Sequence, residues 1–178
     1  MNMQDVFTGK HGVLTLTPDK KTPEGTAAST VLAAYGDAAT STIARLSNIE
    51  VYVDTALEEF HQIGFRHAVS IHPGDIHIHG KVGRAYVNGA MLFLLQGKGA
   101  TDQFKSEPYV QPAFDISLAL NDPAVPTSTA IVSITGVKFA TWMHTIPEDG
   151  FIMENLTFKA LAINVVDKAD KVTSVTFK

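Results

Sequence analysis

Hydrophobic and polar residues alternate along much of the chain, and a period of two predicts β-strands. In residues 48–55 (NIEVYVDT), Ile49, Val51 and Val53 share one face, and the intervening residues share the other. Similar alternation or β-branched enrichment predicts further strands at residues 12–17 (GVLTLT), 114–120 (FDISLAL), 130–139 (AIVSITGVKF) and 154–167 (ENLTFKALAINVVD). The pattern therefore predicts a mainly β fold.

One segment departs from this period and predicts a helix at about residues 83–97 (GRAYVNGAMLFLLQG). Its apolar residues recur at i, i+4, i+7 and i+8, which places them on one helical face. They are Val87, Met91, Leu94 and Leu95. Gly97 follows as a natural terminator.

Three polar segments read as loops. Residues 18–42 are small and polar around a short apolar island, and form a loop or insertion in what we expect to be one domain of residues 1–178. Residues 121–130 carry two prolines, which disfavour the interior of a strand. Residues 101–112 separate the predicted helix from the next strand.

The composition is that of a globular protein, with 45% hydrophobic and 18% charged residues in 178. The absence of cysteine excludes disulfides and thiolate metal sites. The formal net charge of −4 disfavours a generic DNA- or membrane-binding surface, which needs clustered Lys and Arg. The longest apolar run is far too short to cross a bilayer, and the first residues do not resemble a signal peptide. We therefore expect no membrane contact.

The stretch from Val69 to Gly80 (VSIHPGDIHIHG) holds three histidines and raises the question of a metal site. Pro73-Gly74 suits the centre of a tight turn, which would pair the residues on either side of it as a hairpin. Its apolar residues then share one face and its polar residues the other. The polar face, hereafter the polar row, would comprise Arg66, Ser70, His72, Asp75, His77, His79 and Lys81.

His72, His77 and His79 could converge on a metal, with Asp75 orienting one ring. No further His or Glu follows at the spacing of a cupin-like site, so a solvated or interface-facing polar row is the favoured interpretation. The acidic residues Asp54, Glu58 and Glu59 likewise suit a solvated strand end better than a catalytic carboxylate pair. No catalytic motif or cofactor signature points to an enzyme.

The order of the elements resembles the tail tube (major tail) proteins of long-tailed bacteriophages. The resemblance spans about residues 45–167 and includes the alternating strand RLSNIEVYVD, the glycine-bounded helix GRAYVNGAMLFLLQGKG and the strand PAFDISLALNDP. Its last element is the succession AIVSITGVKFATWMHTIPEDGFIMENLTFKALAINVVD. Residues 18–42 have no counterpart in this pattern.

The resemblance implies a β-sandwich or barrel-like protomer with one flanking helix, no enzymatic activity and no cofactor. It further implies homohexameric rings that stack into a hollow tube through which the phage genome passes during ejection, without sequence-specific DNA binding. Expected partners are tape-measure, terminator and baseplate or initiator proteins, and in contractile tails a sheath protein. Such a protein is made and assembled in the host cytoplasm and resides in the virion tail.

On this interpretation the polar row is a candidate lumen or subunit-interface face, and residues 18–42 and 101–112 are candidate contacts between rings. Two alternatives remain open at the level of sequence. One is a metal-dependent β-barrel enzyme that uses His72, His77 and His79. The other is a different tail or capsid subunit, such as a terminator, decoration or baseplate protein, which would form a small closed oligomer.

Overall fold

A computed structural model describes residues 9–35, 41–42, 46–86, 88–97, 110–121, 129–167 and 175–177. The described part is mainly β, as predicted, and contains nine strands and two α-helices. The strands are β1 (Gly12–Thr17), β2 (Ser41–Thr42), β3 (Leu46–Phe60), β4 (Ser70–Ala85), β5 (Phe114–Asn121), β6 (Thr129–Thr145), β7 (Met153–Ala160), β8 (Ala162–Asp167) and β9 (Val175–Phe177). The helices are α1 (Pro23–Tyr35) and α2 (Ala90–Gln96), and a short 3-10 turn, η1 (Gly9–His11), precedes β1.

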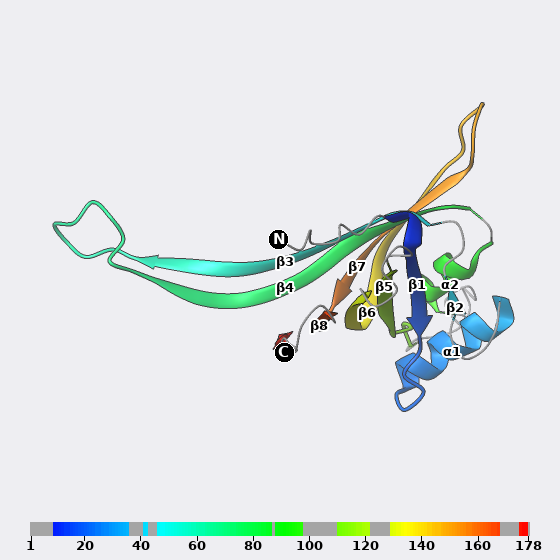
Figure 1. Ribbon diagram of the computed structural model, residues 1–178, viewed down its shortest axis with the longest axis horizontal. Coiled ribbons are helices and arrows are strands. Elements are labelled where there is room, and N and C mark those ends of the chain that lie inside the picture. Colours follow the sequence, from blue (N-terminus) through cyan, green and yellow to red (C-terminus); the bar gives the residue numbers. More distant parts are fainter. Residues whose placement is uncertain are drawn as a thin grey trace, which may run out of the picture.

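The strands form one curled antiparallel sheet in the order β2-β1-β5-β6-β7-β4-β3, with β8 and β9 added beside β6 (Figure 1). The first half of β6 pairs with β5 on one side and with β8 on the other. The second half of β6 pairs with β7, which continues the sheet to β4 and β3. Thus β6 joins two halves of the sheet, here called sheet A (β2, β1, β5, β6, β8, β9) and sheet B (β6, β7, β4, β3).

A kink between the two halves depends on Gly136 and Leu161. Gly136 has a φ of 66°, a left-handed conformation that glycine adopts without steric cost. A Cβ atom at Gly136 would lie 2.6 Å from Cδ1 of Leu161, so a larger residue does not fit there. The amide of Leu161 donates a hydrogen bond to the carbonyl of Thr135 at 3.0 Å, which keeps the β7–β8 segment against β6 through the bend.

Both sheet halves and both helices contribute to one hydrophobic core. Its largest members with almost no exposure are Phe114, Phe139, Phe158, Leu14, Leu16, Leu94, Ile116, Ile134 and Leu156. Phe139, predicted to pack in the core, is 1% exposed, and Trp142 packs against the same cluster. The apolar faces predicted from alternation are therefore the buried faces of β1, β5, β6 and β7.

The prediction of a loop at residues 18–42 is wrong for residues 23–35, which form α1. Ala28, Val31 and Leu32 on this helix are at most 4% exposed and belong to the core. The small residues of this segment were taken for loop residues, but alanine is the best helix former and the short apolar island is the buried face. The part of this segment at residues 36–40 lies outside the described residues, as do residues 101–109 and 122–128 of the other predicted loops.

The predicted helix at residues 83–97 is too long. The observed helix α2 covers Ala90–Gln96, and residues 83–85 continue strand β4 instead. Cross-strand pairing with β3 and β7 outweighs the helical spacing in this segment, because Gly83, Arg84 and Ala85 find partners on β7. Met91 and Leu94 are buried as predicted, and the helix ends at Gly97 with a φ of 78°, whereas Val87 lies outside the described residues.

Candidate assembly surfaces

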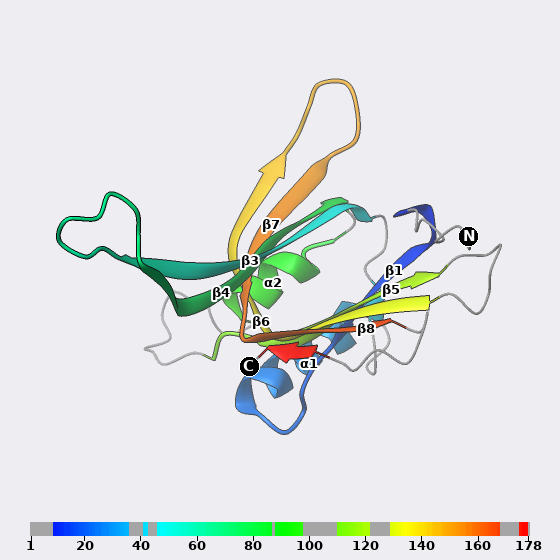
Figure 2. The ribbon, with the colours of Figure 1, turned by 60° about the vertical axis from the view of Figure 1, so that its left-hand side comes forward.

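Strands β3 and β4 extend far beyond the body of the molecule as a long hairpin (Figure 1, Figure 2). The last core residue on this hairpin is Ile78, which is opposite Val53. The arm is defined here as residues 53–77, beyond that position. At about 3.3 Å per residue, Val53 to Phe60 alone spans roughly 23 Å. A projection of this length has too few intramolecular contacts to be stabilised by the core of its own subunit.

The arm exposes large hydrophobic side chains that a solitary protein would bury. In the pairing register, Thr55 is opposite Ile76 and Leu57 is opposite Pro73, so the apolar side of the arm continues the buried face of sheet B. Its exposed hydrophobic residues, given with their exposed fractions, are Val53 (46%), Leu57 (63%), Phe60 (57%), Ile63 (101%), Phe65 (64%), Val69 (54%), Ile71 (59%) and Ile76 (45%). An apolar surface of this extent, on an element that protrudes, indicates a protein–protein interface.

The predicted turn at Pro73-Gly74 is wrong. Residues 70–85 form the single strand β4, and its hairpin partner is the preceding strand β3, connected through residues 61–69. Pro73 is opposite Leu57 at a register shift, where three steps along β4 match two along β3. The proline therefore occupies a β-bulge, one of the few strand positions that tolerate it. Tight-turn chemistry and bulge chemistry are alike at the level of sequence.

The bulge nevertheless keeps most of the polar row on one face. Asp54 and Glu58 share a face of β3, and their cross-strand partners are His77 and His72. By the same register Ser70, His79 and Lys81 share that face, opposite Phe60, Tyr52 and Glu50. Asp75 lies at the bulge, and Arg66 lies apart from the others in the connection at the end of the arm.

The histidines of the polar row are adjacent to carboxylates and hydroxyls rather than to one another. Nε2 of His79 lies 2.6 Å from Oδ2 of Asp54, and Nε2 of His72 lies 3.0 Å from Oγ of Ser70. Among the described residues, no group of three or more His, Cys, Asp or Glu side chains is arranged to hold a metal ion. The geometry thus offers no support for the metal-enzyme alternative. It suits a hydrated polar surface.

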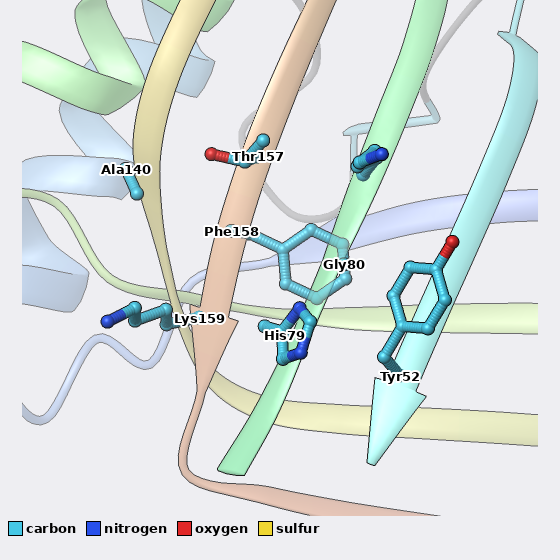
Figure 3. A pocket seen from close by; sticks show the side chains of 8 residues that line it. Tyr52, His79, Gly80, Ala140, Thr157, Phe158 and Lys159 are labelled. Carbon is cyan, nitrogen blue, oxygen red and sulfur yellow. The ribbon is translucent and has the colours of Figure 1, made fainter. Parts of the chain in front are cut away.

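A shallow pocket of about 330 Å³ lies on this polar face at the base of the arm (Figure 3). Tyr52 and His79 stack across β3 and β4 with ring centroids 5.3 Å apart, and the ring of Phe158 covers Gly80 from the neighbouring strand β7. A Cβ atom at Gly80 would lie 2.5 Å from Cζ of Phe158, so only glycine allows this packing. Lys81, Lys159 and Thr157 complete the polar lining.

Tyr52 is electrostatically coupled to the adjacent acid on its own strand. Its hydroxyl donates a 2.6 Å hydrogen bond to Oε2 of Glu50. This hydrogen bond, reinforced by the negative charge of the carboxylate, raises the pKa of Tyr52 above its ordinary value. The outer face of sheet B thus pairs its polar groups with one another instead of presenting an isolated, activated group.

A second hairpin, formed by β6 and β7, projects in a different direction from the arm (Figure 2). It also exposes apolar side chains: Met143 is 57% exposed, Ile146 is 70% exposed and Phe151 is 83% exposed. These residues lie at or beside the connection between the two strands. The molecule therefore has two protruding apolar elements.

A buried ion pair joins the bases of the two hairpins. Nε of Arg84 on β4 donates to Oε1 of Glu154 on β7, and these side chains are 5% and 0% exposed. The indole Nε1 of Trp142 on β6 donates to the other carboxylate oxygen at 2.9 Å. A second nitrogen of Arg84 donates to the carbonyl of Asn88, just before α2, at 3.2 Å. Three strands and the start of a helix thus share one charged network.

Sheet B has open edges in the part of the chain that the structure describes. Strand β3 pairs with β4 on one side, and no described strand pairs with its other side. Strand β6 pairs with β5 up to Val137, and its residues 138–145 pair with β7 alone. Unpaired edges of this length leave backbone groups available for a strand from another subunit.

The fold matches solved structures of phage tails and of contractile injection machines. A chain in the structure of the anti-feeding prophage tube-terminating cap superposes with a TM-score of 0.56 at 10% identity, over 94% of this chain and 95% of that chain. A chain in the SPP1 tail tube superposes with a TM-score of 0.53 at 8% identity, over 93% and 81% of the two chains. A sheath–tube complex of an extracellular contractile injection system gives a TM-score of 0.52 at 10% identity, over 91% and 92%.

No protein-family model matches the sequence, and no curated protein matches it at a significant level. At identities near 10% the structural matches define the fold alone. The chain thus has the tail-tube fold, which confirms the fold inferred from the resemblance, with two helices in place of one. None of the helices in the described residues is long and apolar enough to cross a membrane.

Sequence reasoning missed the arm as an interface. Val53, Leu57, Ile71 and Ile76 carry the alternation typical of a half-buried strand, and that pattern does not reveal which molecule buries them. The length of the two alternating segments around residues 61–69 was the available signal, because a hairpin of two such long strands must extend beyond a core of this size. The acidic residues Asp54, Glu58 and Glu59 are exposed on the arm, as predicted.

Proposed function

We propose that the protein is a structural subunit that self-assembles into the hollow tube of a phage tail or a related injection machine. Its exposed arm carries the proposal, since the tail-tube fold is combined with a long apolar projection that is stable only when covered. Copies of the chain join into six-membered rings, and the rings stack. Burying each of the large side chains of the arm contributes roughly 1.5–3 kcal/mol to such contacts.

The open edges of sheet B suit ring closure. The free edge of β3 in one copy can pair with residues 138–145 of β6 in the next copy, so that sheet B continues around the ring. Each copy would then contribute four strands, β6, β7, β4 and β3, to a closed inner barrel. The helices and sheet A would lie outside it, because they cover the apolar side of sheet B.

The lumen would then be lined by the polar face of sheet B, which includes His77, His79 and Lys81 of the polar row. Its charges in the body of the molecule nearly balance: Lys81, Lys138 and Lys159 face Glu50 and Asp54. A strongly basic lumen would retain DNA through counterion release, whereas a nearly neutral one lets it pass. With −4 per chain, a ring of six carries a formal charge of 6 × (−4) = −24. Both features suit a conduit for the genome.

The proposed partners are further copies of the chain and the proteins that bound the tube, namely tape-measure, terminator and baseplate or initiator proteins, with a sheath in contractile machines. The proposed location is the virion tail after assembly in the host cytoplasm. We propose no catalytic activity and no cofactor. A cap or terminator subunit is the second candidate, because the structures with a similar fold include the anti-feeding prophage cap. Such a subunit would form rings that do not stack.

Two neighbouring substitutions on the arm test the proposal. Ile71→Asp places a charge on the apolar side of β4, and His72→Asp places the same charge on the polar side one residue later. Both residues are exposed, so both variants should fold. We expect Ile71→Asp to abolish assembly in sedimentation velocity and His72→Asp to leave it unchanged. Equal assembly of wild-type protein and Ile71→Asp would remove the arm from the account.

A further inference from the structure

The end of the arm carries a basic and aromatic tip on an acidic shaft. Between Asp54 and Asp75 the chain has four carboxylates and a single Arg or Lys, Arg66, which is exposed in the connection between β3 and β4. Phe65 beside it is 64% exposed and Ile63 is 101% exposed. The tip here means residues 61–69.

Local hydrogen bonds give the tip a defined shape. The amide of Phe65 donates to the carbonyl of Gln62 at 3.1 Å, and the amide of Val69 donates to the carbonyl of Phe60 at 2.8 Å. Gly64 between them has a φ of 92°, which suits a turn. Arg66 and Phe65 are thus presented together at the far end of a projection, an arrangement that favours insertion into a partner.

A groove of about 450 Å³ lies at the other end of the molecule, between the start of α1 and the kink in β6. Three carboxylates line it, Asp19, Glu24 and Asp115, against one lysine, Lys138. Apolar groups are present as well, since Phe114 contributes to the wall and Leu161, 80% exposed, lies at the kink. The groove therefore combines a formal charge of −2 with an apolar surface.

The acids of the groove differ in how far they are already engaged. Oδ1 of Asp115 accepts a 2.9 Å hydrogen bond from the amide of Gly136, and Oδ1 of Asp19 accepts one of 3.1 Å from the amide of Lys21. Glu24 lies in the first turn of α1 and is half-buried. Within the described residues its carboxylate forms no hydrogen bond or ion pair, so it has full capacity for a cation.

We propose that the arm tip of one copy docks in this groove of a second copy, with Arg66 against Glu24 and Phe65 against the apolar wall. A guanidinium matches a carboxylate in charge and in planar geometry, and an adjacent aromatic ring supplies the apolar contact. The occupant must come from another copy, because the arm extends away from α1 in its own subunit (Figure 1). This inference rests on the proposed self-assembly and assigns its acceptor surface.

Charge reversal provides the first test. Arg66→Glu should raise the concentration of half-maximal assembly at least tenfold, and so should Glu24→Arg, while the double variant Arg66→Glu/Glu24→Arg should recover most of the loss. Lys10→Glu is the matched control, because it reverses an exposed cation in η1, remote from the arm, and should assemble like the wild type. Circular dichroism should show the same folded signal for all four. Wild-type-like assembly of Arg66→Glu would overturn the docking while leaving the tube proposal intact.

Cysteine cross-linking provides the second test, since the natural chain contains no cysteine. The variants Arg66→Cys and Glu24→Cys, mixed and oxidised, should give a disulfide-linked dimer, and a chain carrying both should give a ladder of multimers. Arg66→Cys mixed with Lys10→Cys should give neither. Assembly of the wild type without the specific cross-link would overturn the docking alone. A wild type that never self-associates, with no cross-link, would overturn the tube proposal and the docking together.

Discussion

The buried pair of Arg84 and Glu154 is the feature whose removal should destabilise the fold most clearly. In the variant Arg84→Ala, the carboxylate of Glu154 stays 0% exposed and loses its cationic partner. Among the described residues, the indole of Trp142 is then its remaining side-chain hydrogen-bond donor. One charge-assisted hydrogen bond does not compensate for the desolvation of a carboxylate.

The expected loss follows from the depth of the pair. Removing one partner of a buried ion pair costs about 3–5 kcal/mol, whereas a whole domain has about 5–15 kcal/mol of stability. For a chain of this length, each kcal/mol lowers Tm by about 2–4 °C, so Arg84→Ala should lower Tm by roughly 6–20 °C. The apolar double variant Arg84→Met/Glu154→Leu removes both charges and should be far less destabilised than Arg84→Ala.

Denaturant unfolding at protein concentrations too low for self-association would measure these differences, followed by circular dichroism and by the fluorescence of Trp142, the single tryptophan of the chain. Lys81→Ala is the control, because Lys81 lies on the same strand, is exposed and forms a loose 3.9 Å ion pair with Glu50. It should change stability by less than about 0.5 kcal/mol. If Arg84→Ala were as mild as this control, the network would not hold the two hairpins together.

Three further predictions concern single positions. Gly136→Ala should cost about 1–3 kcal/mol in thermal unfolding, because of its positive φ and its contact with Leu161; an unchanged Tm would refute the kink. Leu32→Ala should cost about 2–5 kcal/mol, since this side chain is 4% exposed; a cost below about 0.5 kcal/mol would restore the loop interpretation. Glu50→Gln should lower the raised pKa of Tyr52 in a phenolate absorbance titration. Because that pKa is raised by folding, its contribution to stability should be present below pH of about 10 and lost at higher pH; an unaltered titration would contradict the coupling.

Alternation predicted the strands well because their two faces have different surroundings in the body of the molecule. The buried positions of β5, β6 and β7 follow it closely, as Ile116, Phe139 and Phe158 illustrate. It failed where local chemistry has two structural solutions. Pro73-Gly74 suits both a turn and a bulge, and the choice depends on the partner strand β3, twelve or more residues away. Residues 83–85 have helical spacing, yet they pair with β7.

The candidate surfaces were predictable in composition but not in position. The polar row was predicted with the right strand residues on one face, although a wrong turn was used to place them there. The groove that contains Asp19, Glu24 and Asp115 was not predictable, because it unites residues almost a hundred positions apart through the kink at Gly136. Exposure of Leu57 or Ile71 also depends on how far the hairpin projects, which is a property of the tertiary structure.

Electron microscopy of the purified protein over a range of concentrations tests the central claim most directly. The account predicts hollow tubes of uniform width built from stacked six-fold rings, formed by the wild type and by His72→Asp but not by Ile71→Asp. Closed rings that never stack would point to a cap or terminator subunit instead. A monomer at every concentration, with the exposed arm of residues 53–77 remaining uncovered, would contradict self-assembly.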